Sequence, residues 1–325
     1  MTTSTNLINL RKWVKNDLAN LDATIHESLH SDIASINSIS QHITQNPGKR
    51  LRPLLTLLTA KACGYQGDAH ILLAAIIELI HTATLLHDDV VDESTQRRGH
   101  ITANAKWGNA ISVLVGDFLY SRSFQLMAQL NHPQVFQTLA DTTNTIAEGE
   151  VLQLTQSCKT DLTEQTYLQV IHHKTAKLFE SACHLSALVA DMPLQTIQAL
   201  RLYGQQFGMA YQLMDDILDY TGSGSLGKNT GDDFREGKLT LPLIDTLKKA
   251  NQSERRQLED HINGKCPMAF EEALQLMRRH NAFEYAQSLA ISQSREAGKA
   301  LNEIAPSPYR DARESLLAVI INRDH

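Results

Sequence analysis

The stretch ILLAAIIELIHTATLLHDDVVDESTQRRG, residues 71–99, joins a long apolar run to a dense cluster of charges. Few polar residues, among them Glu78 and His81, interrupt the run before residue 87. Four acids then fall within six residues, and two adjacent arginines follow. Since a helix that is apolar on all sides is normally buried, this stretch predicts a core helix whose end carries a polar site.

The acids at this end include Asp88, Asp89 and Asp92, in the pattern D-D-x-x-D. On a helix, residues i and i+4 lie on one face, so Asp88 and Asp92 can direct their carboxylates at one point. Asp89 projects about 100° away as a supporting group. Two ionised carboxylates at such short range repel unless a cation lies between them. With oxygen ligands and no Cys or His set for zinc, the pattern favours Mg²⁺.

A lone D-D-x-x-D is more often a solvated helix end than a metal site. The pattern recurs, however, at Asp215, Asp216 and Asp219 in QLMDDILDY, again at the end of a long apolar run. Two such helix ends facing each other across a cavity could hold several Mg²⁺ ions. A diphosphate matches this charge, because Mg²⁺ prefers to bind through substrate oxygens.

Basic residues in four further motifs supply complementary charge. Arginine offers a planar fork to phosphate oxygens, and lysine offers a mobile point charge. Any one of these side chains alone is more often a solvated surface group. Only the whole set of basic residues indicates an anion-binding site. They are Lys49, Arg50 and Arg52 in GKRLRP, Arg97 and Arg98 in RRG, Lys174 beside Thr175 in HHKTAKLF, and Lys228 and Lys238 in LGKNTGDDFREGK.

Helical spacing of apolar residues continues along almost the whole chain, and alternating strand-like runs are hard to find. The glycine-rich stretch at 221–233 is short and charged, which favours a loop over an interdomain linker. We therefore predict one all-α domain over residues 1–325, a helical bundle around a central cavity, with about a dozen helices. The central helices are expected at 69–93, 108–130, 134–157, 164–190 and 195–221.

The composition excludes some classes of protein. The net charge of −6, from 30 basic and 36 acidic residues, gives no support for a nucleic-acid partner. The four cysteines form no CxxC pair, which favours reduced thiols and a cytoplasmic location. The apolar run is shorter than the roughly 18 residues of a membrane span. The N-terminus also lacks the order of a signal peptide, so we expect a soluble protein without stable membrane insertion.

Taken together, the motifs resemble the trans-type polyprenyl diphosphate synthases along nearly the whole chain, most closely the bacterial octaprenyl group that makes the ubiquinone side chain. The resemblance rests on GKRLRP, IHTATLLHDDVVDESTQRRG, SVLVGDFLYSR, IAEGEVLQL, KTAKLFE, YQLMDDILDY and LGKNTGDDFREGKLTLP. It implies repeated condensation of an allylic diphosphate, such as farnesyl diphosphate, with isopentenyl diphosphate. It also implies Mg²⁺ as the cofactor and a homodimer.

The resemblance further assigns roles to single residues. Asp88, Asp92 and Asp215 would bind Mg²⁺, supported by Asp89, Asp216 and Asp219. The allylic diphosphate would contact Arg97, Lys174, Lys228 and Lys238, with Thr175 and Gln212 near the reacting carbons. Isopentenyl diphosphate would contact Gly48, Lys49, Arg50, Arg52, His81 and Arg98.

The length of the product would depend on a tunnel that receives the growing chain. Ala83 and Thr84 lie about one helical turn before Asp88, and their small side chains favour a long product. Phe124 and Met127 are proposed as the tunnel floor, although large apolar residues at helical spacing are ordinarily core. An aromatic residue at Ala83 is expected to shorten the product.

Three other interpretations remain open at this point. The product could have seven, nine or ten isoprene units in place of eight. The chain could be a non-catalytic partner subunit of a heteromeric prenyl synthase, or a helical protein that binds prenyl lipids; a subunit of this kind would be expected to have lost acids from one motif. A terpene cyclase would need no second diphosphate site.

Overall fold

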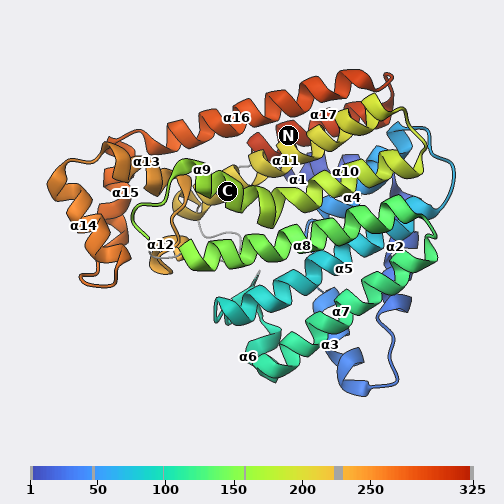
Figure 1. The fold of residues 1–325 in the computed structure, drawn as a ribbon, viewed down its shortest axis with the longest axis horizontal. Coiled ribbons are helices and arrows are strands. Elements are labelled where there is room, and N and C mark those ends of the chain that lie inside the picture. Colours follow the sequence, from blue (N-terminus) through green and yellow to red (C-terminus); the bar gives the residue numbers. More distant parts are fainter. Residues whose placement is uncertain (1–2, 46–47, 98, 157–158, 223–229, 323–325) are drawn as a thin grey trace.

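Helices make up almost all of the regular structure in this computed structural model, which describes residues 3–45, 48–97, 99–156, 159–222 and 230–322 (Figure 1). Two proposed binding residues, Arg98 and Lys228, lie outside the described residues. The helices are α1 (Thr3–Lys12), α2 (Lys15–Ser28), α3 (Ala34–Gln45), α4 (Leu51–Ala62), α5 (Ala69–Val91), α6 (Ala103–Trp107), α7 (Asn109–Gln129), α8 (Pro133–Gln156), α9 (Glu164–Ile171), α10 (Lys177–Val189), α11 (Leu194–Thr221), α12 (Asp232–Arg235), α13 (Leu241–Lys249), α14 (Gln252–Ile262), α15 (Phe270–Arg279), α16 (Ala282–Ala300) and α17 (Pro308–Ile321).

Four short elements accompany these helices in the described part of the chain. Strands β1 (Gln96–Arg97) and β2 (His100–Ile101) pair in an antiparallel hairpin directly after the end of α5. A π-helical turn, η1 (His172–Ala176), joins α9 to α10, and a 3₁₀ turn, η2 (Leu301–Glu303), precedes α17. The predicted all-α fold class is confirmed.

The expected central helices agree with the structure to within two residues at each end, with one difference. The helix expected at 164–190 consists of α9 and α10, joined by the π-helical turn η1. A π turn adds a residue to one helical turn, which apolar periodicity does not reveal.

Helix α5 lies in the interior, as its all-round apolar sequence requires. Leu73, Ile76 and Ile80 are completely buried, and α5 packs against α2, α4, α7 and α10. Helix α11 packs along α10 and α16, and Figure 1 shows α16 running beside it along one edge of the molecule. The two helices that carry the acidic motifs are thereby fixed within one packed framework.

Two hydrophobic clusters form the core. The larger one contains α4, α5 and the first half of α11, and the smaller one contains α13, α15 and the end of α11. Because α11 contributes to both clusters, the smaller one is attached to the helix that carries Asp215. The assignment of residues 1–325 to one domain stays a prediction.

Arg313 on α17 is a fully buried cation. Its Cζ lies 4.0 Å from the centre of the Tyr203 ring, and its guanidinium interacts with the side chains of Cys183 and Tyr203, while no carboxylate among the described residues pairs with it. A buried polar group without a partner costs about 1–3 kcal/mol, and more when it is charged. We therefore expect the buried charge of Arg313 to lower the stability of the fold.

We expect Arg313→Met to raise the free energy of unfolding by about 1–3 kcal/mol, because the variant keeps the buried methylenes and removes the unpaired charge. Thermal denaturation monitored by circular dichroism would measure the change. Arg295→Met, on the exposed face of α16, serves as control and should stay within about 0.5 kcal/mol of the parent. A lower Tm for Arg313→Met would mean that the contacts of the guanidinium with Cys183 and Tyr203 outweigh the cost of burying its charge.

Candidate active site

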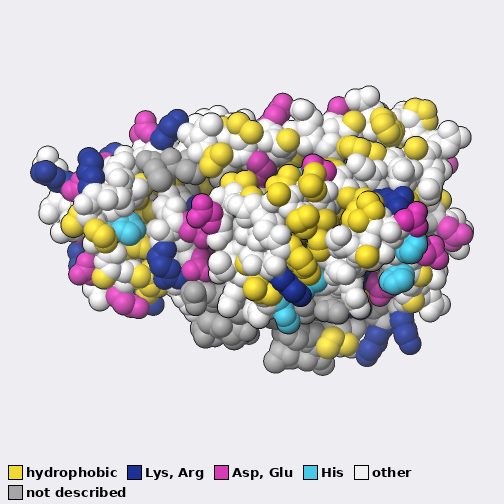
Figure 2. All heavy atoms as spheres, turned by 90° about the horizontal axis from the view of Figure 1, so that it is seen from below, with side chains coloured by type: hydrophobic (Ala, Val, Ile, Leu, Met, Phe, Trp, Pro, Cys, Tyr) yellow, Lys and Arg dark blue, Asp and Glu magenta, His cyan; other side chains and the backbone are white. Residues whose placement is uncertain are grey.

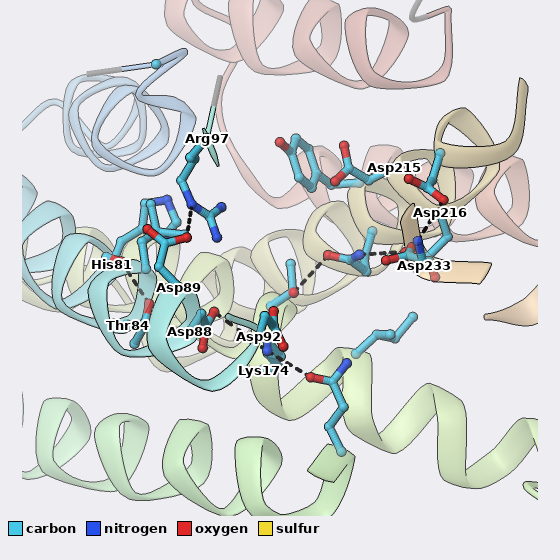
Figure 3. Close-up of a pocket in the computed structure, with 18 of the residues that line it drawn as sticks. His81, Thr84, Asp88, Asp89, Asp92, Arg97, Lys174, Asp215, Asp216 and Asp233 are labelled. Atoms are coloured by element: carbon cyan, nitrogen blue, oxygen red, sulfur yellow. Dashed lines mark hydrogen bonds and ion pairs between the residues drawn. The ribbon is translucent and has the colours of Figure 1, made fainter. Parts of the chain in front are cut away.

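A cavity of about 900 Å³ opens between the end of α5, the end of α11 and the turn η1. Its lining includes every described residue that the sequence analysis assigned to metal or diphosphate binding. These are Gly48, Lys49, Arg50, Arg52, His81, Asp88, Asp89, Asp92, Arg97, Lys174, Thr175, Gln212, Asp215, Asp216, Asp219 and Lys238. Figure 3 shows Asp88, Asp92 and Lys174 on one side of this pocket and Asp215, Asp216 and Asp233 on the other.

The three acids of the first motif lie in two different environments. Asp89 is buried and accepts a hydrogen bond from Arg97 Nε at 2.7 Å, because the β1–β2 hairpin brings Arg97 back over the end of α5. Burial raises the pKa of Asp89, and the charge of Arg97 opposes this effect. Asp88 and Asp92 contact lysines from other elements. The spacing argument, which placed Asp89 apart from the other two, agrees with this geometry.

The second motif shows the same division. Asp216 is buried and accepts hydrogen bonds from Tyr167 Oη at 2.6 Å and from Gln212 Nε2 at 2.7 Å. Burial raises its pKa well above the usual value. Asp219 Oδ2 accepts from the backbone N–H of Asp233 at 3.2 Å. Asp215 is exposed and lines the cavity, so it is the member of this motif most accessible to a ligand.

Two lysines from other elements pair with the acids of the first motif. Lys238 Nζ donates to Asp92 Oδ2 at 3.0 Å and lies 2.8 Å from Glu236 Oε2. Burial lowers the pKa of Lys238, but the nearby carboxylates raise it by more, so the ammonium stays charged. Lys174 Nζ lies 3.6 Å from Asp88 Oδ2 and donates to Glu150 Oε2 at 2.6 Å. Each lysine is placed to meet an anion that approaches the acidic motifs.

The residues assigned to isopentenyl diphosphate lie at the start of α4 and on α5. Arg52 Nη1 is 3.2 Å from His81 Nε2, and the Arg52 guanidinium stacks 4.3 Å from the centre of the Phe179 ring. Arg50 has a left-handed backbone, with φ of 43°, and pairs with Asp22. Stacking fixes the plane of the Arg52 fork, which prepares it for a bidentate contact with an anion.

Several lining residues were not singled out from the sequence. Glu150 and Gln153 both accept hydrogen bonds from Lys174, and they occur in the quoted motif IAEGEVLQL. Tyr167 and Asp233 also line the cavity. The motif itself was the available signal for Glu150; Tyr167 had none, because an isolated tyrosine on an apolar helix face looks like core.

The fit of a metal ion follows from the chemistry of these donors. Among the described residues, no three His, Cys, Asp or Glu side chains converge into a ready-made metal site. Carboxylates in one or two positions per ion are, however, the protein ligands Mg²⁺ uses when substrate phosphates complete its coordination. Asp88, Asp92 and Asp215 fit such a shared arrangement.

Of the four proposed tunnel residues, only one lines the cavity. Thr84 lines the cavity, and its hydroxyl donates to the His81 carbonyl at 2.8 Å. Ala83 is completely buried in the core, Met127 is 2 % exposed and Phe124 is 44 % exposed. These last three do not line the cavity, so their assignment to a tunnel stays a prediction.

Comparison with known proteins identifies the class and then the family. The polyprenyl synthase of Caulobacter crescentus CB15, solved with calcium and isoprenyl diphosphate, superposes with a TM-score of 0.94 at 41 % identity, covering 98 % of each chain. The decaprenyl diphosphate synthase of Rhodobacter capsulatus superposes with a TM-score of 0.93 at 44 % identity, covering 97 % of this chain and 98 % of that one. The fold is therefore that of the isoprenyl diphosphate synthases.

The sequence comparisons agree. The polyprenyl synthetase family model matches residues 33–277. Octaprenyl diphosphate synthase of Escherichia coli is 43 % identical over 321 residues, covering 98 % of this chain and 99 % of that protein. The chain belongs to the polyprenyl synthetase family, and it is a trans-type prenyltransferase.

One described helix, α5, is long and apolar enough to cross a membrane by length and composition. Of its most apolar window, 67 % is buried inside the protein. Its burial accounts for the apolar composition, as expected for a core helix.

In the absence of divalent metal, Glu150 should make the stability of the folded protein depend on pH. Burial, followed by the charge of Asp88, raises the pKa of Glu150 to about 7, although Lys174 acts in the opposite direction. Between about pH 4.5 and 7 the folded protein then binds more protons than the unfolded chain, so stability falls as pH rises through this window. In EDTA, we expect the Tm of Glu150→Gln relative to the parent to rise across this window. Parallel curves of Tm against pH would contradict this prediction.

Proposed function

We propose that this protein is a Mg²⁺-dependent synthase that condenses an allylic diphosphate with successive isopentenyl diphosphates into a long all-trans polyprenyl diphosphate. The observation that carries this proposal is the convergence of two acidic helix ends on one cavity, which Lys174 and Lys238 also line, paired with Asp88 and Asp92. Such a site can neutralise a diphosphate from several directions.

The proposed roles divide the cavity into two parts. Asp88, Asp92 and Asp215 hold Mg²⁺ together with the allylic diphosphate, and the calcium-bound relative supports a divalent ion at such a site. Arg97, Lys174 and Lys238 contact the same diphosphate, as would Lys228. Isopentenyl diphosphate binds near Gly48, Lys49, Arg50, Arg52 and His81, as would Arg98.

The chemistry requires stabilisation of a leaving group. When bound, Mg²⁺ would supply positive charge that favours departure of the diphosphate. Lys174 and Lys238 add fixed charge as the allylic C–O bond breaks. The double bond of isopentenyl diphosphate then attacks the allylic cation, and a proton is lost to the released diphosphate. Thr175 and Gln212, joined by a hydrogen bond of 2.9 Å, present polar atoms near the reacting carbons.

No side-chain nucleophile is required in this scheme. We find no Ser–His–Asp or Cys–His arrangement among the described lining residues of the cavity. The main demands on the protein are electrostatic stabilisation and exclusion of water from the cation.

We propose eight isoprene units as the product length, for a quinone side chain. The E. coli relative is an octaprenyl diphosphate synthase, whereas the R. capsulatus structure is a decaprenyl one, so hepta-, nona- and decaprenyl products are the alternatives. The purified chain should be incubated with Mg²⁺, farnesyl diphosphate and labelled isopentenyl diphosphate, with and without excess EDTA. Chromatography of the products counts the added units.

The same assay separates the remaining possibilities. A non-catalytic partner subunit or a lipid-binding protein would yield no labelled polyprenyl product alone, and a cyclase would yield no chain extended by isopentenyl units. Both acidic motifs are intact, which favours the catalytic interpretation. Equal product formation in excess EDTA would refute the dependence on a divalent ion.

We further propose a homodimer that works in the cytoplasm. Helices α7 and α8 are neighbours and expose several large apolar side chains: Val113, Leu114, Phe124, Phe136, Val151 and Leu154. Figure 2 shows hydrophobic side chains gathered across the middle of the face seen from below the view of Figure 1. Apolar patches of this kind favour a protein partner, and sedimentation equilibrium should give twice the mass of one chain.

A further inference from the structure

The π-helical turn η1 presents two consecutive polar side chains to the cavity. Lys174 donates to Glu150 Oε2 on α8 at 2.6 Å, and Thr175 donates to Gln212 Oε1 on α11 at 2.9 Å. The turn therefore lies between two helices and is bonded to both. π turns are rare, occur mostly as single turns inside α-helices, and are frequent at functional sites.

Two glycines allow α8 and α11 to touch the backbone of this turn. A Cβ added at Gly149 would lie 2.7 Å from His173 Cβ and 2.9 Å from the backbone nitrogen of Lys174. A Cβ added at Gly208 would lie 2.5 Å from Ala176 Cα. Real Cβ atoms essentially never approach within 3.0 Å, so any larger residue must displace the turn or a helix.

Each glycine lies close to the residue that accepts the hydrogen bond on its helix. Gly149 directly precedes Glu150 on α8, and Gly208 lies one helical turn before Gln212 on α11. The close approach sets the distance of each helix from η1, and the hydrogen bond sets the direction of the side chain. The distance of the helix and the direction of the side chain therefore both depend on one short segment of α8, residues 149–150, and one of α11, residues 208–212.

We propose that Gly149 and Gly208 are positioning residues that hold η1 so that Lys174 and Thr175 meet the allylic diphosphate. This inference rests on the proposed function, because it assumes that these two side chains contact that substrate. The glycines act through the placement of the turn and touch no substrate themselves.

Alanine variants test this proposal. We expect Gly149→Ala and Gly208→Ala each to lower kcat/KM for the allylic diphosphate on the order of 10²-fold, since a displacement of about 1 Å has such an effect on a positioned group. The KM for isopentenyl diphosphate should change little in Gly149→Ala, because Arg52 and His81 lie on α4 and α5, away from the atoms that this Cβ would meet. Steady-state kinetics with each substrate varied in turn gives the two parameters.

Gly204 on α11 provides a matched control. A Cβ there would lie 2.4 Å from the Phe179 carbonyl oxygen, an equally tight contact between α11 and α10 but outside η1. Gly204→Ala should lower Tm as the other two variants do, while the folded protein keeps its kcat/KM for the allylic diphosphate at saturating isopentenyl diphosphate, since the Phe179 ring contacts Arg52, which is assigned to isopentenyl diphosphate. An equal loss of kcat/KM in all three variants would mean that general packing, and not placement of η1, is responsible.

A combined variant separates this inference from the proposed function. If Gly149 acts through Lys174 and Thr175, then adding Gly149→Ala to the double variant Lys174→Ala/Thr175→Val should cost no further activity. Multiplied losses would overturn the positioning role and leave the proposed function intact. Unchanged kinetics for Lys174→Ala would instead refute the role of Lys174 itself. Should a glycine variant fail to fold, Glu150→Gln keeps the side-chain volume and must still lower kcat/KM for the allylic diphosphate.

Discussion

Asp88→Ala and Asp215→Ala are each expected to lower kcat on the order of 10³-fold or more while leaving the helical content unchanged. Both carboxylates line the cavity, from α5 and α11 respectively, and in our proposal each is a ligand of Mg²⁺. Removing either one leaves the charge of the diphosphate incompletely neutralised. Product assays at saturating Mg²⁺, with far-ultraviolet circular dichroism on the same samples, measure both effects.

The control for this prediction is an acid outside the cavity. Glu296→Ala on the exposed surface of α16 removes a side chain that pairs only with the exposed Lys299 among the described residues, an interaction worth about 0–1 kcal/mol. This variant should keep parental activity. Retained turnover in either aspartate variant would contradict the shared metal site.

Thr84→Phe is expected to shift the products to markedly shorter chains. Thr84 lies one helical turn before Asp88 and lines the cavity, so an aromatic ring there would occupy the space next to the allylic diphosphate. Thr84→Val is the matched control, because it removes the hydroxyl and keeps the volume. Chromatography of products from farnesyl diphosphate would show the shift, and an unchanged distribution in Thr84→Phe would refute a tunnel at this point.

The structure also changes the expectation for Ala83. The sequence analysis placed it beside Thr84 at the tunnel entrance, but Ala83 is completely buried and packed in the core. A phenylalanine there would overpack the core, at a cost of about 1–3 kcal/mol. Any change of product in Ala83→Phe must therefore be compared with its loss of stability, whereas Thr84→Phe acts on the cavity directly.

Local patterns were sufficient to predict the five central helices and the acidic motifs, whereas the expected dozen helices compare with seventeen α-helices among the described residues. Helical periodicity depends on residues three and four apart, so the central helices could be located to within two residues. The same spacing separated Asp89 from Asp88 and Asp92. The π turn at 172–176 was missed, because it changes the path of one helix without changing the apolar pattern.

The sequence by itself determined a helical protein whose two apolar core helices each end in three aspartates, because that information lies within a few residues along the chain. Only the tertiary structure decided which groups meet. Lys238 reaches Asp92 across 146 positions of sequence, and Tyr167 holds Asp216 across 49. Such contacts depend on the angles at which whole helices pack, which are set by side-chain shape over the entire core and not by any local spacing.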